Sequence, residues 1–129
     1  MKKKLIIGLF SLSLTVCASD YYYEYGKKIE VTKLYEQRVV KDKNINYYKT
    51  QSGHKIGVTN EIIVQCKSNI DCKDVLKNYS LLNISKLSDK LFLVKISDSE
   101  NVFGLSNILY NNDNIKMAHP NFIKNKKRR

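Results

Sequence analysis

The chain has 129 residues, with 23 Lys or Arg against 12 Asp or Glu, which gives a formal net charge of +11. Its length predicts one domain with a single core. The positive charge lies mainly at the two ends, because residues 19–123 contain 15 basic and 12 acidic residues. We therefore do not expect a strongly basic surface over the body of the protein.

The first residues are typical of a signal peptide. Three lysines at positions 2–4 precede an apolar run over residues 5–16, which is too short to span a bilayer as a helix. Cleavage is expected after Ala18, so the mature chain would be periplasmic or extracellular, and no later segment predicts a membrane span. A lipoprotein anchored through Cys17 is the alternative, but Val16 stands where a lipobox prefers a small residue.

Export argues against nucleic acid as a partner. The rest of the chain also lacks the aromatic and glycine strand pattern on which RNA bases stack. No nucleic-acid partner is therefore expected.

The segment before residue 58 is rich in aromatic and β-branched residues. Residues 21–25 and 28–34 flank Gly26, which predicts a β-hairpin, and residues 45–49 form another extended stretch. The tyrosines of the first run could form a platform for carbohydrate, but on a small hairpin they more often pack across strands. We expect residues 19–57 to be a small hairpin segment that precedes the main domain.

From residue 60 onward, the hydrophobic pattern alternates between strands and helices. Residues 61–66 are a short apolar run suited to a buried strand. Ser68 and Asp71 have the spacing of a capping box, which predicts a helix over residues 70–79. Residues 81–87 and 90–96 then predict two antiparallel strands joined by a polar turn.

The pattern ends with a second helix and a last strand. Asp98 and Ser99 can cap this helix, and residues 115–119 form a strand closed by Pro120, which cannot donate to a ladder. The apolar residues expected on one face of the helix are Val102, Leu105, Ile108 and Leu109.

The order strand, helix, strand, strand, helix, strand predicts an α+β fold of the ferredoxin-like βαββαβ type. Such a fold has one antiparallel sheet with two helices on one face, and its other face is open to a partner. We expect a signal peptide at 1–18, the β-hairpin segment at 19–57, this domain at 58–123 and a basic tail at 124–129.

Two cysteines remain when residues 1–18 are removed. Cys66 and Cys72 predict a local disulfide in an oxidising compartment, whose loop closure would contribute a little over about 2 kcal/mol. The alternative is two unpaired small core residues. We expect no metal site, because two thiols without a nearby His provide too few ligands, and we expect no cofactor.

Three strings carry a resemblance to a known family. They are NEIIVQC at residues 60–66, LFLVKI at 91–96 and IKMAHPNFI at 115–123. In this order of elements, the chain resembles the propeptides of subtilisin-like serine proteases, above all the fervidolysin-like type. The resemblance covers residues 58–123, and the preceding hairpin looks like the leader of some bacterial subtilases.

The resemblance implies how the chain would bind a protease. The open sheet face would pack on the protease, and the chain after the last strand would enter the active-site cleft like a bound product. The residues implied for the cleft are Pro120, Asn121, Phe122, Ile123 and Lys124. The alternative is that Phe122 and Ile123 complete the core.

The resemblance also implies a role for Asp89, in the turn between the two middle strands. This edge of the domain would face paired helices of the protease, whose free N–H groups a carboxylate could cap. The alternative is an ordinary polar turn residue.

We expect no enzymatic activity, because no Ser, His and Asp constellation is recognisable in the sequence. Unlike the family it resembles, the chain has no protease domain after the propeptide-like part and stops at Arg129. The predicted function is an exported, stand-alone propeptide-like protein, monomeric when free, that binds a subtilisin-like serine protease as inhibitor or folding chaperone. Two alternatives stay open. The chain is the detached leader of an interrupted protease gene, or it is a basic envelope protein whose tail binds anionic surfaces.

Overall fold

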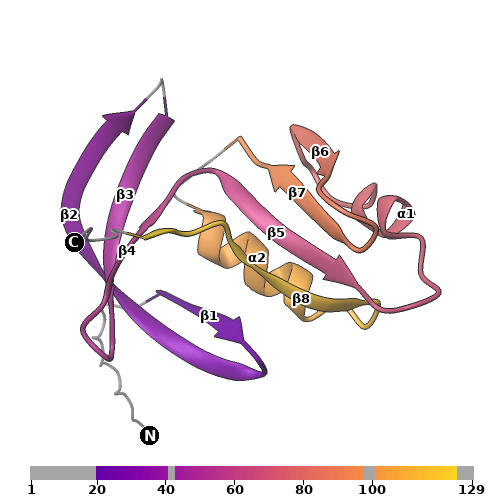
Figure 1. The fold of residues 1–129 in the computed structure, drawn as a ribbon, viewed down its shortest axis with the longest axis horizontal. Helices are drawn as coiled ribbons and strands as arrows, with labels where there is room; N and C mark the ends of the chain where they lie inside the picture. The colour runs from indigo at the N-terminus through magenta and orange to yellow at the C-terminus, as the bar shows by residue number, and fades with distance from the viewer. Residues whose placement is uncertain (1–19, 41–42, 98–100, 125–129) are drawn as a thin grey trace, which may run out of the picture.

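The computed structural model describes residues 20–40, 43–97 and 101–124. This part of the chain forms two antiparallel sheets and two α-helices (Figure 1). The first sheet contains β1 (Asp20–Glu24), β2 (Lys27–Val40), β3 (Lys43–Thr50), β4 (Lys55–Val58) and β9 (Ile123–Lys124). The second contains β5 (Glu61–Cys66), β6 (Asn83–Lys86), β7 (Leu91–Lys95) and β8 (Ile115–Pro120), and the helices are α1 (Cys72–Leu76) and α2 (Val102–Tyr110).

The first sheet has the strand order β1-β2-β3-β4-β9. The hairpin predicted around Gly26 is confirmed, because β1 and β2 pair from Asp20 opposite Val31 to Glu24 opposite Lys27. The two turn residues, Tyr25 and Gly26, both have positive φ, at 51° and 76°. This is the backbone of a two-residue hairpin turn that matches the twist of the strands. The extended stretch predicted at 45–49 is confirmed as part of β3.

The second sheet has the strand order β6-β7-β5-β8, and all of its neighbouring strands are antiparallel. The strands predicted at 61–66, 81–87, 90–96 and 115–119 are confirmed as β5, β6, β7 and β8, with shorter bounds for β6 and β7. The helix α2 packs on β8 and β5, behind these strands in Figure 1.

Both helices differ from the sequence prediction. The first is only five residues long, and its N-cap residue Asp71 makes no side-chain capping hydrogen bond, so the predicted capping box is wrong. In α2, Val102 and Leu109 are buried as expected, but Ile108 is 56% exposed. Phe103 faces the core instead, because the aromatic side chains of the first sheet meet this face of α2. The predicted caps at 98 and 99 lie outside the described residues.

The predicted ferredoxin-like α+β class is wrong. The described residues are mostly strand, with two antiparallel sheets and only two α-helices, so the fold is sheet-rich. The segment expected to be a small hairpin supplies β1, β2, β3 and most of β4. Its buried residues Tyr22, Val31 and Tyr48 join the same hydrophobic cluster as Val94 and Leu109. The ferredoxin-like prediction placed the core between one sheet and two helices. In the structure, the segment at 19–57 also contributes to that core.

Candidate docking surface and the C-terminal segment

The segment expected to enter a protease cleft begins inside the core. Pro120 is buried and lies opposite Ile62 in the ladder between β8 and β5. The ring centroid of Phe122 lies 4.6 Å from that of Tyr22 and 5.6 Å from that of His119, with which it is nearly parallel at 7°. Phe103 of α2 completes the cluster at 6.5 Å. Phe122 therefore packs against the core, as the alternative interpretation expected.

Asn121 is held by Glu61, the first residue of β5. The backbone N–H of Asn121 donates to the carbonyl oxygen of Glu61 at 2.9 Å, and its side-chain Nδ2 donates to Oε1 of Glu61 at 3.1 Å. Lys43 Nζ contacts the other carboxylate oxygen at 3.1 Å. Nothing local in the sequence marks Glu61, since its partners lie 18 and 60 residues away.

The carboxylate of Glu61 is almost fully buried, with 5% of the residue exposed. Burial acts to raise its pKa, but the hydrogen bonds from Asn121 and Lys43 and the positive charges of Lys43 and Lys95 outweigh burial. The pKa of Glu61 is therefore lowered, and the side chain is ionised at neutral pH. It clamps the C-terminal segment to the second sheet and to β3.

The last two described residues form β9 at the end of the first sheet. Ile123 lies opposite Gly57, and Lys124 lies opposite Ile56. Ile123 is 38% exposed, whereas Phe122 is half-buried. Within the described residues, β9 has β4 as its neighbour on one side and an unpaired edge on the other. Of the predicted cleft residues, Ile123 is thus the one whose side chain the structure shows to be exposed.

Among the described residues, no helix covers one face of the second sheet. In β5, Ile62 and Val64 point into the core beside α2, so Ile63 and Gln65 point to the opposite face. Leu93 lies opposite Ile63, and Leu91 lies opposite Gln65. On the other side of β5, Met117 also lies opposite Gln65. We call Ile63, Leu91, Leu93 and Met117 the open-face residues; all four are half-buried.

Asp89 lies in the turn between β6 and β7, as expected. Its side chain is 99% exposed and lies 3.9 Å from Lys86 Nζ. An ion pair this exposed contributes little to stability, so the carboxylate can exchange its partner at little cost. Asp89 and Lys86 also border a hollow of about 290 Å³ that lies against the disulfide loop.

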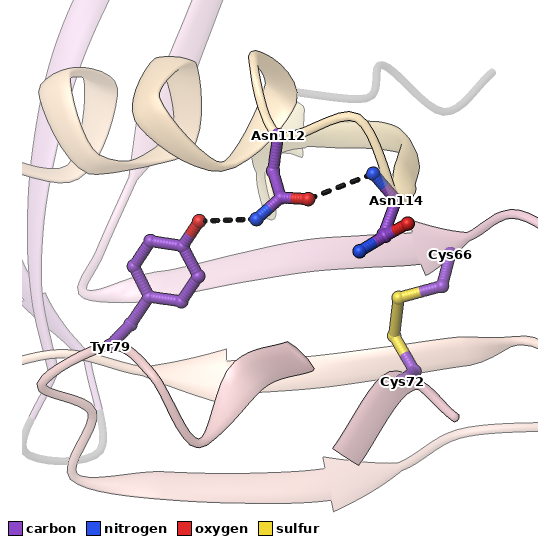
Figure 2. The surroundings of a disulfide bond; sticks show 5 residues. All are labelled: Cys66, Cys72, Tyr79, Asn112 and Asn114. Carbon is purple, nitrogen blue, oxygen red and sulfur yellow. Dashed lines mark hydrogen bonds between the residues drawn. A yellow bond between two sulfur atoms is a disulfide. The ribbon is translucent and has the colours of Figure 1, made fainter. Parts of the chain in front are cut away.

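The predicted disulfide is present in the structure. Cys66 and Cys72 are bonded, with their Cα atoms 5.6 Å apart (Figure 2). A second contact lies near it, where Asn112 Nδ2 donates to the Tyr79 hydroxyl at 2.8 Å. The two contacts fasten the segment around α1 to β5 and to the turn after α2. The disulfide is consistent with an oxidising compartment.

No protein-family model, curated protein or solved structure matches this chain. Within residues 20–40, 43–97 and 101–124, no helix is long and apolar enough to cross a membrane. The same residues contain no group of three or more His, Cys, Asp or Glu side chains placed to hold a metal ion.

Proposed function

We propose that this chain is an exported protein that binds a subtilisin-like serine protease, as inhibitor or folding chaperone, through the open face of its second sheet. The observation that carries the proposal is the group of open-face residues, Ile63, Leu91, Leu93 and Met117. They lie around Gln65 on a sheet face that no helix of the described residues covers. A free sheet face of a small domain is usually polar, so adjoining apolar side chains on it favour a protein partner.

The exposed carboxylate of Asp89 suits a partner that presents helix ends. Asp89 lies in the turn before Leu91, its side chain is fully exposed, and its ion pair with Lys86 is loose. A helix N-terminus stabilises a neighbouring negative charge by about 0.3–1 kcal/mol, so Asp89 could replace the contact with Lys86 by a contact with such a helix. This is the role that the resemblance to subtilase propeptides implies for it.

The arrangement of the C-terminal segment favours contact with the protease active-site cleft beginning at Ile123. Pro120 and Phe122 anchor the segment in the core, and the hydrogen bonds to Asn121 fix its direction. An anchored segment loses little conformational entropy when it binds, and the unpaired edge of β9 can add main-chain hydrogen bonds to a partner strand. We therefore assign cleft contact to Ile123 and Lys124, and an anchoring role to Pro120, Asn121 and Phe122.

The test is inhibition of a purified subtilisin, measured with a chromogenic peptide substrate. Leu93→Lys places a charge in the centre of the open face and should weaken inhibition by at least about tenfold, because a buried unpaired charge opposes docking. Ile108→Lys is the matched control, since Ile108 lies on the exposed side of α2 and the same charge there should leave inhibition unchanged. Far-UV circular dichroism checks that both variants are folded.

Two results would count against the proposal. The first is full subtilisin activity in the presence of micromolar wild-type protein. The second is equal inhibition by the Leu93→Lys and Ile108→Lys variants, which would show that the open face makes no contact.

A further inference from the structure

A second concave site lies between the β1–β2 turn, the end of α2 and strands β5 and β8. Its volume is about 470 Å³, which falls within the range of about 300–1,000 Å³ typical of small-ligand pockets. The walls include Tyr23, Tyr25, Tyr110 and Met117, and Gln65 and His119 contribute polar groups. We call it the tyrosine pocket.

The aromatic walls of the tyrosine pocket are ordered before any ligand binds. Tyr23 and Tyr110 are stacked, with ring centroids 4.5 Å apart and an interplanar angle of 9°. His119 is held by its stacking on Phe122 and by a hydrogen bond between its Nδ1 and the carbonyl oxygen of Pro120 at 2.8 Å. A ligand would therefore meet a preformed surface and lose little affinity to side-chain ordering.

Tyr25 lines this pocket and has a left-handed backbone conformation, which is unfavourable for a residue with a Cβ. Its φ is 51°, and the residue is 96% exposed. A left-handed backbone costs a residue with a Cβ about 1–2 kcal/mol, and Asn or Gly is the usual choice at this position of a two-residue hairpin turn. Because the ring is exposed, it does not stabilise the fold by packing in the core. A strained and exposed aromatic residue beside an aromatic pocket points to ligand contact.

The polar groups of the pocket narrow the class of ligand. Gln65 and Lys116 form no side-chain hydrogen bond or ion pair with other described residues, so both can bind a ligand. The ammonium of Lys116 shares the pocket with the carboxylate of Glu24, which does not suit a strongly anionic ligand such as a nucleotide. A wholly apolar ligand would displace water from these groups without forming hydrogen bonds to them, and this would lower its affinity.

A sugar ring has both properties that the pocket requires. Its C–H face packs on an aromatic ring, and its hydroxyl groups donate to and accept from amide, carboxylate and ammonium groups. We propose that the tyrosine pocket binds a neutral carbohydrate chain, with the ring of Tyr25 stacked on a sugar unit at the mouth. This site does not include Asp89 or Ile123, but it shares Met117 with the open face.

The experiment compares two exposed tyrosines that share the same backbone strain. Tyr35 also has a positive φ, 48°, and is 89% exposed, but it lies in β2 and does not line the pocket. Asn suits a positive φ, so Tyr25→Asn and Tyr35→Asn should both fold at least as stably as the wild type. The probes are cellohexaose, chitohexaose and laminarihexaose, and binding is followed by NMR chemical-shift changes.

We expect saturable binding of at least one probe to the wild type at up to millimolar concentration. Tyr25→Asn should weaken that binding by at least about tenfold, and Tyr35→Asn should change it by less than about twofold. Gln65→Ala should weaken it as well, which separates a site with hydrogen bonds from an apolar surface. The proposal is overturned if no probe binds, if the two tyrosine variants bind alike, or if Gln65→Ala has no effect.

Discussion

The aromatic cluster around Phe122 leads to a direct test of where the C-terminal segment belongs. Truncation of a fully buried Phe to Ala costs about 3–5 kcal/mol, and half that cost, about 2 kcal/mol, is appropriate for a half-buried ring. The pairs with Tyr22 and His119, at 4.6 and 5.6 Å, are each worth about 0.5–1.5 kcal/mol more. These contributions sum to about 3–5 kcal/mol, and we take the lower end, about 3 kcal/mol, as the expected loss in free energy of unfolding for Phe122→Ala.

The assay is urea unfolding followed by far-UV circular dichroism. With a slope of about 2 kcal/mol per molar urea, the midpoint of Phe122→Ala should fall by about 1.5 M. Ile123→Ala is the control, because Ile123 is partly exposed in β9, and its truncation should cost less than about 1 kcal/mol. The same Ile123→Ala variant should be the one that weakens protease inhibition. Equal midpoints for the two variants would refute the assignment of Phe122 to the core.

Two further predictions concern the disulfide and Glu61. Replacing both Cys66 and Cys72 by Ser should cost about 2.2 kcal/mol through lost loop-closure entropy at a sequence separation of 6. Reductant should lower the melting temperature of the wild type but not of this variant. The lowered pKa of Glu61 stabilises the folded state above about pH 4.3, its ordinary value, and this contribution is lost as pH falls through the folded-state pKa. Glu61→Gln should therefore cost about 1–2 kcal/mol at pH 7 and flatten the loss of stability in acid, and urea midpoints that are equally pH-dependent in both proteins would contradict this.

Two strands of the second sheet could be predicted from local sequence because β5 and β7 contain short runs of apolar residues, at 62–64 and 91–94. Such a run favours a buried strand and can be recognised without knowledge of the partner strand. The alternation within the run is visible only in the structure, where Ile62 and Val64 are fully buried and Ile63 is half-buried. The β1–β2 turn and the disulfide were predictable for the same reason, since each depends on residues close together in the chain.

The size of the first sheet could not be predicted in this way. Residues Ile45, Tyr47 and Tyr48 of β3 are all buried, because both faces of this strand are covered. Tyr48 faces the core, whereas Ile45 and Tyr47 pack over Gly57, where an added Cβ would lie 2.7 Å from Ile45 Cγ2 and 3.1 Å from Tyr47 Cε1. A strand covered on both faces shows no alternation, and nothing local marks Gly57 as the residue that leaves room for these side chains.

The sequence by itself determined which residue types are present at the candidate sites, namely a Pro-Asn-Phe segment, an exposed turn carboxylate and a group of tyrosines. Only the tertiary structure decided their neighbours. Phe122 meets Tyr22 from a strand 100 residues earlier, and Tyr23 stacks on Tyr110. Such contacts depend on how two sheets and a helix close around one core, and side-chain packing over that distance leaves no periodic trace in the chain.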